Sequence, residues 1–322
     1  MRCPRHYVSD VLPKPIPGVF LTGALLLAPA DSVVAQVQAS ITAFPAPLQQ
    51  NPIPTPLPQL HGFFDGALSA ASLAGIAIGL ELPVTRQSVP APGLDPSTIG
   101  WAIDRDIVGH PSTSADKASD IFLLATALGP PVLALATQPG LHGFGERVRR
   151  PVVLYGQSLL LAEACVQLLK PAADRARPFT YLPASERPSD GSYDVTTRDA
   201  FVSMPSGHSA LGFAAAAYAA TDNLLARPGA GAAEHVAVAS VGALLAGFTG
   251  NLRIRADQHF PTDAIVGSLI GTASGVSVPL LHRYLLPGGR GAPHPGGHAW
   301  LMSAGGYVVG AVAGAGLSSL VY

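Results

Sequence analysis

Six apolar segments follow one another between residues 66 and 281, and almost all of the charge in this region lies between them. Each is rich in Ala, Leu, Val and Gly and runs for about 15 to 18 residues, slightly under the roughly 20 that span a bilayer core. Apolar runs of this length and spacing favour helices over strands. The sequence therefore predicts an all-α fold, a helical bundle with about six core helices at 66–80, 121–137, 152–169, 208–225, 236–252 and 264–281.

The composition favours a membrane location for this bundle. Hydrophobic residues make up 48% of the chain and charged residues only 12%, whereas about a quarter of an ordinary soluble domain is charged. Two interpretations stay open. The segments are either transmembrane helices, with small residues that allow close packing, or the buried helices of a soluble exported protein. The low charge favours the first.

The same numbers exclude other classes of protein. A formal net charge of -1 and the lack of a Lys/Arg run interleaved with aromatic residues argue against nucleic-acid binding. The chain has two cysteines, Cys3 and Cys165, which cannot build a disulfide scaffold or a cysteine-ligated zinc site.

The flanking segments differ from the bundle in composition. Residues 1–35 resemble an export signal or an uncleaved anchor, because basic residues precede an apolar run that ends in small residues. Residues 36–60 are too rich in proline for regular helix and predict an extended linker. A helical domain is expected at 61–285, with polar clusters between 170 and 263, and 286–322 is a Gly-rich tail that could form a hairpin or contact the membrane.

The distribution of arginines predicts an orientation for the membrane interpretation. Arg147, Arg149 and Arg150 lie between the second and third segments and would be cytoplasmic under the positive-inside rule. The loop after the third segment would then face outward. With six spans the N-terminus would also be inside, which conflicts with a cleaved export signal. The alternative is therefore an exported soluble protein or one with fewer spans.

Three polar clusters lie at the ends of the apolar segments. The first follows the third segment and supplies Lys170 and Arg177. The compact ammonium group of lysine and the planar guanidinium group of arginine both suit a phosphate dianion. The second precedes the fourth segment: Ser206 is a natural helix N-cap, and Gly207 lets a ligand approach the backbone. A helix N-terminus attracts an anion, and His208 in the first turn would stand beside it.

The third cluster joins the fifth and sixth segments. His259 and Asp263 are four residues apart, with Pro261 suited to a first helical turn between them. This spacing brings the carboxylate near one imidazole nitrogen, so that Asp263 could hold the tautomer in which the other nitrogen is nucleophilic. Arg253 adds a third cation. Each cluster alone also has an ordinary structural explanation, as a basic helix end, a capping turn or a structural i,i+4 pair.

Together the clusters resemble the superfamily of type 2 phosphatidic acid phosphatases, bacterial acid phosphatases and vanadium haloperoxidases. Its pattern is Lys-x6-Arg-Pro, then Pro-Ser-Gly-His, then Ser-Arg-x5-His-x3-Asp, and all three parts occur here in order and with the right spacing. The resemblance covers roughly residues 118–285. The one departure is Leu252, where the family usually has Ser before the arginine, and it puts a supporting hydrogen bond in doubt.

The resemblance implies a metal-independent phosphatase without a cofactor. His259 would attack phosphorus and form a phosphohistidine, His208 would protonate the departing alcohol and later activate water, and Asp263 would orient His259. The oxygens of the phosphoryl group would be bound by Lys170, Arg177, Ser206, Gly207 and Arg253. The expected substrate is a phosphorylated lipid or a small phosphate ester, and the expected location is the inner membrane, with the site facing outward.

Alternatives to this function stay open. A soluble periplasmic acid phosphatase would use the same residues. A haloperoxidase would hold vanadate in the same pocket, with His259 as its axial ligand. A non-catalytic envelope protein would be insensitive to changes at His208 or His259. The motifs would bind only the phosphate group, so they do not predict the alcohol of the substrate.

Overall fold

The computed structural model describes residues 60–86, 88–109, 111–137, 145–286 and 294–321. Within these ranges it contains eight α-helices, short 3-10 turns and no strand, which confirms the all-α prediction. The six predicted segments fall on α3 and on α5 to α9. In chain order the helices are α3 (Gly62–Glu81), α4 (Ala102–Arg105), α5 (Thr113–Thr137), α6 (Glu146–Ala173), α7 (Gly207–Ala226), α8 (Ala232–Arg255), α9 (Pro261–Leu280) and α10 (Gly297–Val321).

Two of the segments predicted from sequence cannot be compared with the structure. The export signal or anchor at 1–35 and all but the last residue of the Pro-rich segment at 36–60 lie outside the described residues.

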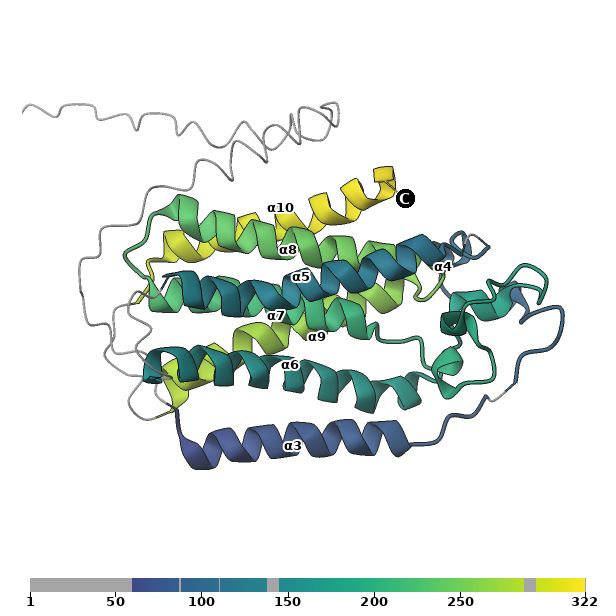
Figure 1. Cartoon of the computed structure of the whole chain (residues 1–322), viewed down its shortest axis with the longest axis horizontal. Coiled ribbons are helices and arrows are strands. Elements are labelled where there is room, and N and C mark those ends of the chain that lie inside the picture. Colours follow the sequence, from purple (N-terminus) through teal and green to yellow (C-terminus); the bar gives the residue numbers. More distant parts are fainter. Residues whose placement is uncertain (1–59, 87, 110, 138–144, 287–293, 322) are drawn as a thin grey trace, which may run out of the picture. The chain divides into compact units, whose positions relative to one another are not determined.

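Helix α7 is the centre of the bundle and contacts α5, α6, α8 and α9 (Figure 1). Four consecutive alanines at 214–217 are all buried. Small side chains let the neighbouring backbones come close. From α9, Gly271 lies so near that a Cβ there would be 2.1 Å from the carbonyl oxygen of Ala210. The Ala-rich and Gly-rich composition therefore sets the helix spacing around α7.

The Gly-rich tail contains a helix that packs along α8 (Figure 1). Its contact face consists of Gly306, Gly310 and Gly314, spaced four residues apart. A Cβ at Gly310 would lie 2.2 Å from the carbonyl oxygen of Ser240, and one at Gly314 would lie 2.0 Å from that of Leu244. This is the small-xxx-small packing of membrane helices, and it makes α10 part of the bundle.

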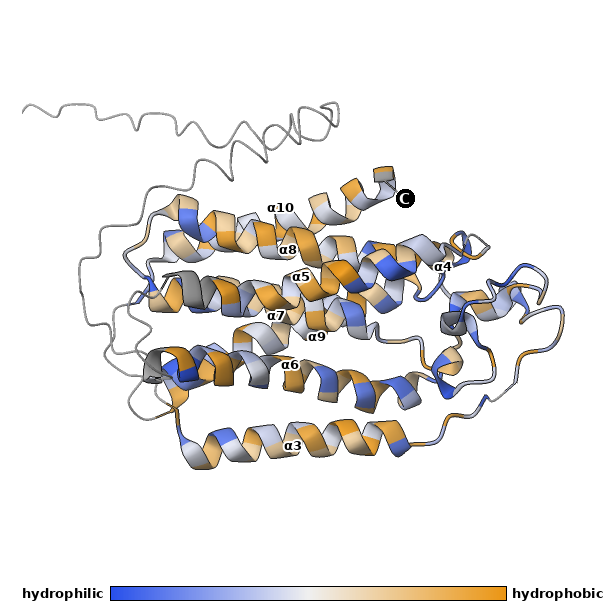
Figure 2. Cartoon of the chain, in the orientation of Figure 1, coloured by the Kyte–Doolittle hydropathy of each residue, from blue (hydrophilic) through white to orange (hydrophobic). Residues whose placement is uncertain are grey.

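Five of the described helices, namely α3, α6, α8, α9 and α10, are long and apolar enough to cross a membrane. The central helix α7 is not among them. Apolar residues cover much of α3 and the outer helices in Figure 2. Large apolar side chains such as Leu269, Ile121 and Val312 are exposed by 62% or more. Extended apolar surface of this kind is rare on soluble monomers and indicates association with a membrane or another apolar partner.

The segments between α3 and α5 and between α6 and α7 form a cap over one end of the bundle. A buried cluster holds these segments together, with Val84 and Leu94 from the first and Phe179, Tyr193 and Phe201 from the second. The second segment is wound into 3-10 turns at Pro178–Tyr181, Gly191–Tyr193 and Arg198–Phe201. The cap fixes the polar residues that follow α6 and precede α7.

The close approach of α9 to α7 gives a test of this packing. Gly271→Ala should destabilise the protein by about 1–3 kcal/mol, because the methyl group meets backbone and the helices must move apart. Gly305→Ala on α10 is the matched control, since a Cβ there meets nothing within 4 Å. Thermal unfolding of both variants in detergent measures the difference. Equal stability of the two variants would contradict the packing described for α7 and α9.

Candidate active site

The turn from α8 to α9 places the third motif at the capped end of the bundle. Arg253 lies in the last turn of α8, and Asp257 reverses the chain with a φ of 52°, a left-handed conformation that Asp tolerates better than most residues. His259 follows, with its backbone N–H bonded to the carbonyl oxygen of Arg253 at 3.2 Å. Pro261 then begins α9, as its fixed φ favours.

His259 is buried beside Asp263. The Nδ1 atom of His259 lies 3.8 Å from Oδ2 of Asp263, too far for a hydrogen bond, and it has no hydrogen-bond partner among the residues that the structure describes. The carboxylate instead accepts from Ser203 Oγ at 2.5 Å, from the Phe260 N–H at 2.8 Å and from Arg175 Nη1 at 2.6 Å. The structure thus brings the pair together, while the orienting hydrogen bond remains a prediction.

Arg175 holds Asp263 in this position and is a residue that the sequence analysis missed. Its guanidinium bridges Asp263 and Asp104 of α4, with Nη2 2.7 Å from Asp104 Oδ2, and it stacks over the Phe260 ring at 4.0 Å. Both carboxylates are fully buried. Its position two residues before Arg177, inside the first motif, was the available signal. No comparable signal in the sequence pointed to Asp104, because it lies far from all three motifs along the chain.

The three predicted cations converge on the same region, and each has a carboxylate partner. Arg177 donates to Asp199 Oδ2 at 2.7 Å and to Gln258 Oε1 at 2.7 Å. Lys170 Nζ lies 4.0 Å from Asp199 Oδ1. Arg253 donates to Asp116 of α5. All three cations are less than a tenth exposed, so their charges are only weakly screened by solvent.

The start of α7 supplies the second motif. Ser206 is the N-cap, as the sequence predicts, and its Oγ accepts the N–H of Ser209 at 3.3 Å. Gly207 and His208 are the first two helical residues, where backbone N–H groups have no intrahelical acceptor. A Cβ at Gly207 would meet nothing closer than 3.8 Å. The helix therefore presents a positive, unobstructed end.

His208 is the more accessible of the two histidines, with 28% of its side chain exposed. Its Nε2 lies 2.8 Å from Oδ1 of Asp120 on α5. Burial and the nearby Arg253 lower the pKa of His208 to about 4, against the opposing effect of Asp120. The ring is therefore neutral at pH 7. An anionic ligand beside it would raise the pKa again.

The charges around His259 show that the three motifs share one electrostatic site. Burial lowers the pKa of His259 well below its ordinary value, and the charges of Arg177, Arg253 and Lys170 lower it further, with a contribution from His208. A neutral imidazole is the nucleophilic form. Burial alone would raise the pKa of Asp199, but Arg177 and Lys170 together bring it below its ordinary value.

This arrangement can bind and stabilise an anion with distributed charge. Three buried cations lie close enough to His259 to lower its pKa, and the N-terminus of α7 carries the second histidine, His208. Such an arrangement suits a phosphoryl group in its transition state. As for metals, the described residues contain no group of three or more His, Cys, Asp and Glu side chains that could hold an ion.

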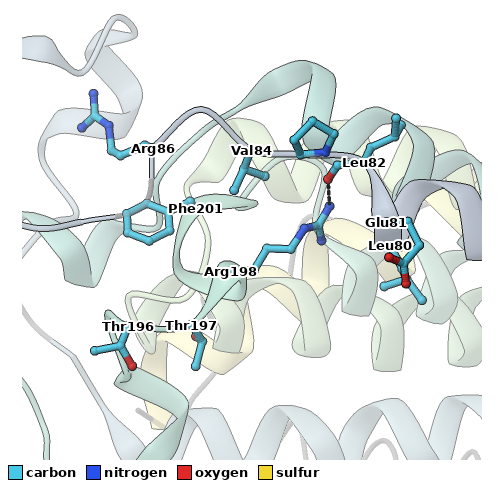
Figure 3. A pocket seen from close by; sticks show the side chains of 10 residues that line it. Leu80, Glu81, Leu82, Val84, Arg86, Thr196, Thr197, Arg198 and Phe201 are labelled. Atoms are coloured by element: carbon cyan, nitrogen blue, oxygen red, sulfur yellow. Dashed lines mark hydrogen bonds between the residues drawn. The ribbon is translucent and has the colours of Figure 1, made fainter.

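A separate pocket of about 450 Å³ lies between the end of α3 and the 3-10 turn before α7 (Figure 3). It is lined by residues such as Leu82, Arg198 and Phe201 and by none of the predicted site residues. Arg198 donates to the carbonyl oxygens of Gly79 and Leu82 at 2.9 and 3.1 Å and so caps the carboxyl end of α3. The side chain thus anchors the cap to the bundle.

The fold is all-helical, and the capped end of the bundle holds two histidines and three buried cations. Residues 151–287, which begin within α6 and continue past the end of α9, match the family model of the PAP2 superfamily. The match agrees with the superfamily that the three motifs resemble, and phosphatase activity is the activity that this superfamily suggests. Comparisons with curated proteins and with solved structures found no match.

The bridge made by Arg175 can be tested by stability. Arg175→Met should cost about 3–5 kcal/mol, because it leaves Asp104 and Asp263 buried without a counter-charge. Adding Asp104→Asn should recover part of this loss, since one of the two uncompensated carboxylates is then removed. Denaturant unfolding of both single variants and the double variant gives the coupling. Strictly additive losses would show that the bridge does not exist.

Proposed function

We propose that this protein is a metal-independent phosphatase that hydrolyses the phosphate ester of a lipid through a phosphohistidine at His259. The observation that carries the proposal is the convergence of three buried cations on one neutral, buried histidine. Neutral imidazole can attack phosphorus, and fixed cations can stabilise the charge of the phosphoryl oxygens in the place of metal ions.

The two histidines have different roles in this mechanism. The Nδ1 of His259 faces Asp263, so Nε2 is the atom that forms the bond to phosphorus as the bond to the alcohol oxygen breaks. His208 gives its proton to that oxygen. In the second step water attacks the phosphohistidine, His208 takes a proton from the water, and phosphate leaves as the P–N bond breaks. Lys170, Arg177, Arg253, Ser206 and the Gly207 N–H bind the phosphoryl oxygens.

A groove beside His208 supports a lipid as the substrate. The groove has a volume of about 330 Å³ and is lined by Leu123, Leu124 and Ala127 of α5, Leu159 of α6 and Leu211 of α7. Asp120, which contacts His208, also lines it. The alcohol must leave on the side of the proton donor, so the groove is where its hydrocarbon chain would lie. Of the lining residues, Leu124 of α5 is exposed on the outer surface of the bundle.

We propose the orientation in the inner membrane that the sequence predicts. Since α6 ends and α7 and α9 begin at the site, the start of α6, with Arg149 and Arg150, lies at the opposite end of the bundle. This end would be cytoplasmic, and the active site would face outward, at the level of lipid head groups.

The phosphohistidine can be tested by trapping. Purified protein in detergent with EDTA, given a radiolabelled p-nitrophenyl phosphate and quenched in alkali, should carry label. His259→Ala should carry none. His208→Ala should still be labelled, because p-nitrophenolate leaves without a proton, but should lose its label slowly through lack of a base for water. Label on His259→Ala, or wild-type turnover by both variants, would refute the mechanism.

The groove gives a test of the lipid alcohol. Ala127→Phe should fill it and raise KM for a long-chain alkyl phosphate roughly tenfold, because excluding two methylene groups costs about 0.8 kcal/mol each. Turnover of p-nitrophenyl phosphate should not change. The matched control is Ala304→Phe on the exposed face of α10. An unchanged KM for the long-chain ester would remove the groove from the substrate site, while the phosphatase assignment would stand.

A further inference from the structure

Helix α5 contributes acidic residues to the site although it precedes the family-matched segment 151–287. Asp116 and Asp120 are one helical turn apart and therefore point to the same side of α5. Asp116 pairs with Arg253. Asp120 Oδ1 lies 2.8 Å from Nε2 of His208. Each carboxylate thus reaches a different member of the phosphate-handling group.

The departure from the family pattern at Leu252 explains how α5 is held there. Leu252 is fully buried and packs against Ala115 and Ala118 of α5. One turn further along, the rings of Phe122 and Phe248 stack with centroids 4.7 Å apart. An apolar side chain in place of the usual serine therefore fixes α5 against α8, in the register that directs its acidic face to the site.

We propose that Asp120 is the positioning residue of His208, so that each histidine of the site has its own carboxylate. Asp120 accepts a hydrogen bond from the Nε2–H of His208. This hydrogen bond fixes the tautomer in which Nδ1 alone exchanges protons with the substrate. This role corresponds to the one predicted for Asp263 toward His259. The inference rests on the proposed phosphatase mechanism and adds to it a residue from outside the family-matched segment.

The fixed tautomer lets one nitrogen act in both steps. In the first step the imidazolium gives its Nδ1 proton to the alcohol oxygen as the P–O bond breaks, and the Nε2 proton stays on the ring, hydrogen-bonded to Asp120. In the second step Nδ1 takes a proton from the water whose oxygen bonds to phosphorus as the P–N bond breaks. The imidazolium is then restored, and the protons balance over the cycle.

The other charges near His208 explain why it needs a carboxylate. Arg253 of α8, Arg177 of the cap and burial all disfavour the imidazolium, and His259 lies within electrostatic range. From α6, Glu163 Oε2 lies 3.9 Å from the position of a Cβ at Gly207. Asp120 is the carboxylate in direct contact with the ring. It opposes the cations and raises the pKa of His208 toward the value a general acid needs.

The pH profile of kcat/KM tests this role. A general acid must be protonated, so its pKa sets the alkaline limb of the profile. Asp120→Asn removes the charge that raises this pKa, and the alkaline limb should move about one unit toward lower pH. Asp106→Asn, the same change at the exposed C-cap of α4, is the control and should leave the limb in place. A limb that does not move in Asp120→Asn would overturn the proposal.

The leaving group provides the second readout. At pH 7 Asp120→Asn should lose roughly tenfold in turnover of an alkyl phosphate, whose alcohol needs a proton, and less than about threefold with p-nitrophenyl phosphate. Asp120→Glu should recover part of the alkyl activity. Equal losses on the two esters, or no recovery by Glu, would indicate a structural role and overturn the proposal. A wild-type protein that forms no phosphoenzyme would instead refute the proposed function itself.

Discussion

Burial of positive charge at the end of an apolar helical bundle is the constraint around which the site is organised. Moving an ion out of water costs several kcal/mol unless a partner compensates it. In this protein Lys170, Arg177 and Arg253 are all less than a tenth exposed. Carboxylates from the cap and from α5 stand beside each of them. The cap and α5 are therefore as necessary to the site as the motifs themselves.

Most of the fold follows from the sequence because the apolar segments are long and evenly spaced. The spacing of apolar residues and the composition are properties of each segment alone. The segments 152–169 and 208–225 could therefore be assigned to helices without knowledge of the helices that pack against them. The tail was harder because its glycines suggest a loop. The spacing of Gly306, Gly310 and Gly314 was the signal for a helix, but it acquires meaning only against the backbone of α8.

The site divides in the same way between local and distant information. Lys170, Arg177, His208 and His259 carry their chemistry in motifs of fixed spacing, so they could be predicted. Their partners could not. Asp104, Asp116 and Asp120 precede His208 by more than fifty residues. The sequence around each of them gives no sign of a role in the site. Only the packing of α4 and α5 on the bundle brings them to Arg175, Arg253 and His208.

Leu252 belongs to a local sequence motif and also makes a tertiary contact with a distant helix. A serine before Arg253 would support the arginine through one local hydrogen bond, whereas leucine offers none. In this chain the support comes from α5, where Asp116 pairs with Arg253 and Ser119 Oγ lies 3.5 Å from its Nη1. Leu252 itself packs against α5 and holds that helix in place. Leu252 thus adds apolar tertiary contacts with α5, and the same packing carries Asp120 to His208. A change in one motif residue and the recruitment of an acidic helix to the site are, on this view, parts of one structural solution.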